Sequence, residues 1–291
     1  LDILTQMKIK TVQGADDSLG VAERRVISTE LLSLISQIDL NVTQAIWNGK
    51  TLLSGETSSD DTWRAFNFQI GAGNSSINDT LKFNLLNWLN VPFRSDNSGF
   101  TAYRLNVTNA GINLSENFDK AGFRYPPKGS ITINGEVFNL SNYPTVQSFM
   151  DAINFNTVIQ ADITYDSIND RFVLNNQDTV SNMTISETGT EFVSGEGNEI
   201  TNGFLAQSSI DIGIFNGLTR SKTINPEGYI ASSNSAYYHN IHITSGSAPL
   251  LMRKIDNAIK DVSSALSYTG SITNRLTYQE KSLNTSKINT D

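Results

Sequence analysis

Apolar residues recur at helical spacing along the segment from Val21 to about Leu53. Steps of three and four residues place them in one stripe on a helix face. Leu32 and Ile35 widen this stripe, so we expect more than one partner helix to cover it. The stripe consists of Ile27, Leu31, Leu34, Ile38 and Val42.

A tight turn is predicted where this helix ends, at Asn48-Gly49. Asn-Gly is a strong hairpin signal because both central positions of a type I′ turn need positive φ. Downstream, residues 63 to 70 alternate apolar and polar side chains as a half-buried strand does. We therefore expect residues 46 to 71 to form a β element packed on the helices.

Both ends of the chain also have helical patterns. Residues 1 to 13 place Leu4, Met7 and Val12 on one face, with Ile3 and Ile9 alongside, and the Gly- and Asp-containing segment 14 to 20 ends this helix. The last stretch, residues 250 to 288, has near-heptad spacing typical of a coiled-coil seam. Its seam positions are Ile255, Ile259, Val262, Leu266, Thr269, Ile272, Leu276 and Leu283.

The middle of the chain, from about residue 74 to 246, is rich in Asn, Ser, Thr and Gly and predicts short strands. Residues 130 to 138 indicate a strand, an Asn-Gly turn and a return strand. A helix follows from the N-cap Thr145 to Asn154, and strands are expected at 158 to 165 and 171 to 175. This order gives a β-β-α-β-β unit. Beyond it we expect a strand at 182 to 186 and a polar surface loop at 189 to 203.

The predicted fold class is α+β. An elongated antiparallel helical bundle with a β-hairpin element would be formed by residues 1–90 and completed by a C-terminal helix in residues 246–291. Residues 91–245 would form an inserted, β-rich outer domain that contains the β-β-α-β-β unit.

Composition narrows the function. With 21 basic and 29 acidic residues the formal charge is −8, and no basic patch is evident, so nucleic acid is not expected as a partner. The absence of cysteine excludes disulfides and thiol chemistry. No apolar run is long enough to span a membrane, so membrane insertion is not expected. Because the sequence starts inside a helical pattern without Met, we expect a core fragment of a longer chain.

Five segments resemble the markers of bacterial flagellins, in that family's order, and they cover both ends of the chain. Residues 129 to 154 also resemble the Ile-Asn repeat of variable domains in flagellins and in filament cap and hook-associated proteins. The five segments are 1 to 13, the position of Glu30, 47 to 53 (Trp-Asn-Gly-Lys-Thr-Leu-Leu), 68 to 72 (Phe-Gln-Ile-Gly-Ala) and 270 to 276, which contains Asn274 and Arg275.

The resemblance implies a structural subunit without cofactor or enzymatic activity. Such a subunit is secreted unfolded through the flagellar type III export apparatus and self-assembles into the extracellular filament used for swimming motility. Its partners would be copies of itself, an export chaperone, and the hook-associated and cap proteins. The family's extra terminal helices, which line the inner tube, have no counterpart in this sequence.

The resemblance also places a subunit- and receptor-facing surface at Gln6, Lys10, Gln13 and Glu30. Positions that usually hold Arg and Leu in flagellins strongly sensed by the flagellin-specific Toll-like receptor are Gln6 and Lys10 here, whereas Glu30 keeps its acid. A charge at Lys10 replaces an apolar contact, which predicts a weak agonist. Alternatively, Gln6 and Lys10 are simply solvated helix positions.

Other interpretations stay open. A hook–filament junction protein shares the bundle, and a surface adhesin or glycan-binding module could use outer-domain aromatic residues. His239 and His242 could share a helix face as metal ligands, but no third ligand is evident. Residues 166 to 170 lack the Gly and terminal Glu of a calcium loop, which favours a solvated turn. The candidate glycan-binding aromatics are Trp88, Phe93, Tyr103 and Tyr125.

Overall fold

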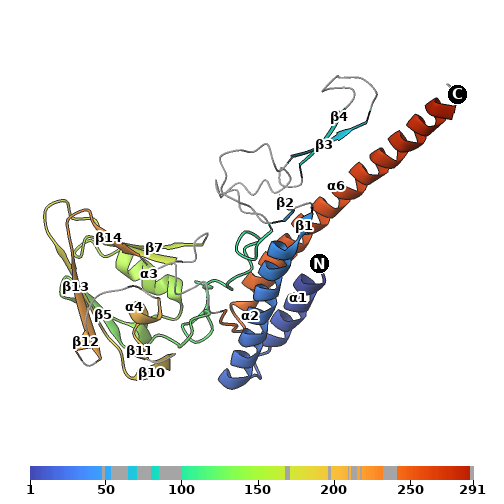
Figure 1. Cartoon of the computed structure of the whole chain (residues 1–291). Helices are drawn as coiled ribbons and strands as arrows, with labels where there is room; N and C mark the ends of the chain where they lie inside the picture. The colour runs from blue at the N-terminus through green and yellow to red at the C-terminus, as the bar shows by residue number, and fades with distance from the viewer. Residues whose placement is uncertain are drawn as a thin grey trace. The chain divides into compact units, whose positions relative to one another are not determined.

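The computed structural model describes residues 1–47, 50–53, 65–70, 80–84, 100–167, 171–195, 198–208, 210, 215–216, 218–231 and 241–288. As predicted, the fold is α+β, with helices at both ends of the sequence and antiparallel strands between them (Figure 1). The chain divides into two compact units. Unit 1 comprises residues 1–8, 34–107 and 254–291, and unit 2 comprises residues 9–33 and 108–253. The domain limits 1–90, 91–245 and 246–291 stay a prediction.

The first helix, α1, spans Asp2–Gly14. Its buried positions are Leu4, Met7, Thr11 and Gly14, at helical steps of three and four residues. The prediction that Val12 faces the core is wrong, since Val12 is exposed and Thr11 occupies the buried position one residue earlier. The helix ends as predicted, where Asp16 Oδ1 accepts a hydrogen bond of 2.9 Å from the Ser18 amide.

The second helix, α2, spans Val21–Gln44 and buries most of the predicted stripe. Ile27, Leu31, Ile38 and Val42 are buried, and Ile35 takes the place expected for Leu34. The stripe therefore forms one continuous apolar face along the helix.

The long C-terminal helix, α6, spans Ala248–Ile288, as predicted (Figure 1). Its seam differs in detail from the heptad prediction, because Ala265 is buried while Leu266 is 61% exposed. A straight α-helix drifts by about 20° per heptad, so a strict seven-residue repeat moves off the buried face within two repeats. The buried positions are Leu251, Ile255, Ala258, Ala265 and Ile272.

Two small antiparallel ladders belong to unit 1. Strand β1, Ile46–Trp47, pairs with β2, Lys50–Thr51, across a two-residue connection. That spacing fits the predicted hairpin, although Asn48 and Gly49 themselves lie outside the described residues. Strand β3, Ala65–Gln69, lies within the predicted strand and pairs with β4, Thr80–Asn84, which the sequence did not reveal.

In unit 2 the predicted β-β-α-β-β order is confirmed, but its two hairpins belong to different sheets. Strands β5 and β6 lie in a five-stranded sheet of order β12-β13-β9-β5-β6, and β7 and β8 lie in a three-stranded sheet of order β14-β8-β7. The elements are β5 Ser130–Ile133, β6 Glu136–Asn139, η3 Leu140–Asn142, α3 Val146–Asn154, β7 Ala161–Asp166, β8 Arg171–Asn176, β9 Met183–Thr188, β12 Phe215–Asn216, β13 Thr219–Ile224 and β14 Tyr229–Ala231.

Local signals define the start of this unit. Asn134 and Gly135 have φ values of 49° and 90°, as a type I′ turn requires. At the start of α3, Thr145 Oγ1 accepts a hydrogen bond from the Ser148 amide, and Ser148 Oγ accepts one from the Thr145 amide. This capping box explains why the helix begins where it was predicted.

The prediction of a polar surface loop at residues 189 to 203 is wrong. Strands β10, Phe192–Gly195, and β11, Asn198–Thr201, pair there, and Asn202 is buried. The Asn202 amide oxygen accepts hydrogen bonds from the backbone N–H groups of Thr190 and Glu191. Polar residues can therefore be buried here because their hydrogen bonds are satisfied within the segment.

A short helix, α4, spans Phe204–Gln207 and inserts Phe204 into the core of unit 2. The Phe204 ring lies between 5.0 and 6.3 Å from four other aromatic rings. Such packing contributes beyond the apolar area that it buries. The four partners are Phe118, Phe123, Phe149 and Phe172.

A buried ion pair holds α4 in place. The Glu187 carboxylate accepts hydrogen bonds from Arg220 Nε (3.0 Å) and Nη2 (2.6 Å), and from the amides of Leu205 (2.7 Å) and Ala206 (3.1 Å). Burial raises the pKa of Glu187, and the Arg220 charge and the two amides oppose that rise. Glu187 thus links β9 and β13 to the first turn of α4.

None of the helices in the described part of the chain is both long and apolar enough to cross a membrane.

Candidate functional site

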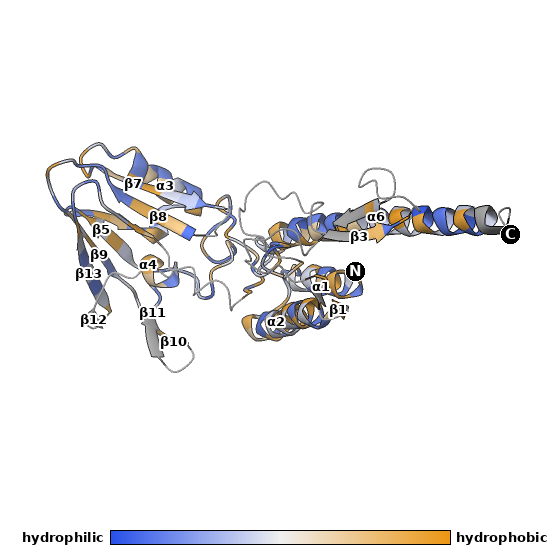
Figure 2. Ribbon diagram, turned by 45° about the horizontal axis from the view of Figure 1, so that its top comes forward, coloured by the Kyte–Doolittle hydropathy of each residue, from blue (hydrophilic) through white to orange (hydrophobic). Residues whose placement is uncertain are grey.

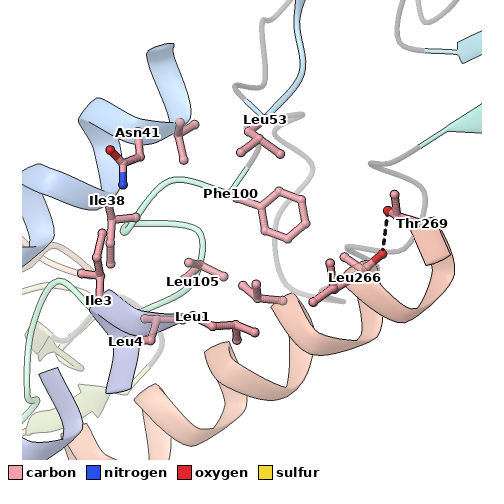
Figure 3. A pocket seen from close by; sticks show the side chains of 13 residues that line it. Leu1, Ile3, Leu4, Ile38, Asn41, Leu53, Phe100, Leu105, Leu266 and Thr269 are labelled. Atoms are coloured by element: carbon pink, nitrogen blue, oxygen red, sulfur yellow. Dashed lines mark hydrogen bonds between the residues drawn. The ribbon is translucent and has the colours of Figure 1, made fainter. Parts of the chain in front are cut away.

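A groove of about 270 Å³ lies within unit 1, between α1, α2, α6 and the segment 100 to 105 (Figure 3). Its lining contains no charged side chain, so acid–base or metal chemistry is not available there. Such a groove suits contact with an apolar surface. Its walls are formed by Leu1, Ile3, Leu4, Ile38, Asn41, Val42, Leu53, Phe100, Leu105, Val262, Ala265, Leu266 and Thr269.

Specific contacts hold these walls together. Lys8 Nζ lies 2.6 Å from Asp256 Oδ1, whereas Leu1 and Leu266 line the same groove further along, so α1 and α6 run antiparallel. The bundle prediction is confirmed in this respect.

The floor of the groove comes from a segment without regular structure. The Ala102 amide donates a 2.8 Å hydrogen bond to Asp39 Oδ1 on α2, and the Phe100 amide donates one of 2.8 Å to the Leu53 carbonyl. These bonds place the side chains of Phe100 and Leu105 between α2 and α6 (Figure 3). No sequence pattern pointed to these two residues.

The same apolar face loses its cover along α6. Ile272, Leu276 and Leu283 follow one another at steps of four and seven residues and share a helix face. Ile272 is 6% exposed, Leu276 is half-buried and Leu283 is 46% exposed. Hydrophobic positions nevertheless continue along the helix (Figure 2). Within the described residues, the groove thus continues into an uncovered apolar strip.

Comparison with known proteins gives likenesses of structure only. No family model matches the chain, and no curated protein matches it in sequence. Solved structures similar to it include FliC from Burkholderia pseudomallei, with 15% identity, a TM-score of 0.39, and coverage of 94% of this chain and 93% of that one.

Two further similar structures come from the hook-associated class. The flagellar hook associated protein-3 of Legionella pneumophila has 13% identity and a TM-score of 0.35, covering 98% of this chain and 84% of that one. FlgL of Xanthomonas campestris has 14% identity and a TM-score of 0.32, covering 99% and 87%. Because all three scores are below 0.5, we base the function on the residues of the chain itself.

The structure brings together two of the residues predicted to form a subunit- and receptor-facing surface. Lys10 Nζ on α1 lies 2.6 Å from Glu30 Oε2 on α2. Gln13 is exposed three residues after Lys10, and Gln6 is exposed four residues before it. The sequence did not reveal this ion pair, because its partners lie on separate helices whose register depends on packing.

The remaining predicted positions are spread over the chain. Asn274 and Arg275 are exposed on α6, just beyond the last fully buried seam residue, Ile272. Asn48 and Gly49 lie outside the described residues.

The alternative chemical sites gain little from the geometry. The described residues contain no group of three or more side chains suited to hold a metal ion, and His239 lies outside them. Asp166 of the suggested calcium loop pairs with Arg171 Nε at 3.2 Å. Of the aromatic residues suggested for glycan binding, Tyr103 and Tyr125 are described and half-buried, and Trp88 and Phe93 are not described.

Proposed function

We propose that this chain is a structural subunit of the bacterial flagellar filament, which assembles with copies of itself into a helical tube for swimming motility. The observation that carries the proposal is the apolar face of α6, whose cover ends between Ile272 and Leu283 beside an open groove. A helical assembly needs two different surfaces on each subunit that fit each other. A groove and an apolar helix strip are such a pair.

The positions of the flagellin-like segments support the proposal. Residues 1 to 13 lie on α1, residues 47 to 53 include part of the β1–β2 ladder, and residues 270 to 276 lie on α6. The first and last of these helices form walls of the groove. The residues that resemble the family therefore lie on the elements that would make lattice contacts.

The test is assembly of the full-length protein carrying Leu266→Glu, followed by electron microscopy. Leu266 lines the groove, and burying a Leu side chain contributes about 1.5–3 kcal/mol, whereas burying an unpaired carboxylate is unfavourable. We expect Leu266→Glu to abolish long tubes while circular dichroism stays unchanged. Val180→Glu, at a position 82% exposed in unit 2, is the matched control and should assemble normally. Normal tubes from Leu266→Glu would contradict the proposal.

The same images separate the two flagellar roles. Long tubes are expected for a filament subunit, whereas short caps alone would favour a hook–filament junction protein. For a filament subunit, the export apparatus, its chaperone, and the hook-associated and cap proteins follow as partners, and the location is extracellular.

We further propose that the protein is a weak agonist of the flagellin-sensing Toll-like receptor. The Lys10–Glu30 pair supports this, because Glu30 already has a partner within the chain and Lys10 puts a charge at the expected apolar contact. Reporter-cell signalling by the full-length protein at the potency of strongly sensed flagellins would refute it.

A further inference from the structure

Two arginines of unit 2 lie over a single aromatic ring. The Arg25 Cζ atom on α2 is 5.2 Å from the centroid of the Tyr125 ring, and the Arg124 Cζ atom is 5.7 Å from it. Each contact is attractive because a ring face attracts cations. The two cations repel each other, however, so this arrangement leaves a concentrated positive charge.

Neither arginine has a carboxylate partner among the described residues, although acidic residues outnumber basic ones in the chain. Nearby basic side chains do have one: Lys120 Nζ lies 2.9 Å and Arg24 Nη2 3.7 Å from the Asp17 carboxylate. The pair Arg25 and Arg124 is therefore an exception that packing within the described chain does not explain.

His242 adds a third polar group to this cluster. Its Nε2 atom is buried and has no hydrogen-bond partner among the described residues. Burial, and then the charges of Arg124 and Arg25, lower the pKa of His242 to about 4, so the ring is neutral at pH 7. No carboxylate contributes to that shift. A neutral imidazole still donates one hydrogen bond.

We propose that Arg25, Arg124 and His242 form a binding site for a sulfate or phosphate group, either as the free ion or as a monoester on a glycan. Guanidinium groups bind such oxyanions through paired N–H donors, and a doubly charged anion neutralises both arginines. The anion would also supply the acceptor that His242 lacks. This site is independent of the groove in unit 1 and of the filament role.

The test follows the His242 ring nitrogens by NMR during titration of the full chain. The sequence has only two histidines, so a His239→Gln background leaves the His242 signals alone in the spectrum. Inorganic phosphate and inorganic sulfate are titrated first, and then a sulfated disaccharide and its unsulfated counterpart. We expect a saturable shift of His242 Nε2 with the ions or with the sulfated sugar, and none with the unsulfated one.

Variants assign the binding to the cluster. Arg25→Gln and Arg124→Gln should each weaken binding by about tenfold or more, because each removes a charged donor pair. Arg275→Gln, an exposed arginine in unit 1, should leave it unchanged. Because Arg25 is exposed, its variant should keep the fold and the test if Arg124→Gln does not.

The relative affinities identify the source of the anion. Tighter binding of the sulfated disaccharide than of inorganic sulfate would assign a glycan, and equal affinities would assign the free ion. The proposal is overturned if no probe gives a saturable shift, or if both arginine variants bind like the parent protein.

Discussion

Removing the Glu187 carboxylate should strongly destabilise unit 2. In Glu187→Ala, Arg220 loses both of its hydrogen bonds to the carboxylate, and the amides of Leu205 and Ala206 lose their acceptor. Breaking a buried ion pair by removing one partner typically costs about 3–5 kcal/mol. Since unit 2 comprises residues 9–33 and 108–253, we expect its melting temperature to fall by about 10 °C.

Differential scanning calorimetry of the full chain measures this loss. Glu136→Ala, an exposed glutamate on β6, is the matched control and should stay within about 0.5 kcal/mol of the parent. The double variant Glu187→Leu with Arg220→Met should recover much of the loss, because no buried charge is left unpaired. If Glu187→Ala costs less than about 1 kcal/mol, then the pair does not hold α4 against the sheet.

Two further predictions concern pH and helix stability. The lowered pKa of His242 means that the unfolded chain takes up a proton first as the pH falls. The free energy of unfolding should therefore decrease by about 3 kcal/mol in total between pH 6.5 and about 4, and urea titrations should show no such contribution in His242→Gln. Gly270 lies inside α6 with no atom within 4 Å of an added Cβ, so Gly270→Ala should stabilise the helix by about 1 kcal/mol. A lower thermal midpoint for Gly270→Ala would contradict this.

Sequence alone predicted the elements that depend on local signals. The Asn134-Gly135 turn and the Thr145 capping box each specify a conformation within four residues, and both are confirmed. The helix stripes were found because their spacing covers several turns. Register was less accurate, as Thr11 and Ala265 show, because a shift of one residue changes the buried face only slightly in the pattern.

Features that depend on distant residues could not be predicted. Asn202 looked like a surface residue because its hydrogen-bond partners become apparent only in the folded chain. The assignment of the two hairpins to different sheets depends on β9, which pairs with β5 across some fifty residues. In the candidate groove, the helix walls were predicted, but Phe100 depends on the contact of its segment with Asp39 and was missed.

The uncovered end of α6 has a consequence for the order of events in growth. Residues 273 to 288 make roughly four turns, a length at which a lone helix is only marginally stable in water. We expect this end to fray in the free chain and to become fully helical only when another surface shields Leu276 and Leu283. A subunit in solution would then be a poor template for its neighbours, whereas the tip of an existing polymer would order each newcomer as it arrives, which favours elongation over spontaneous nucleation.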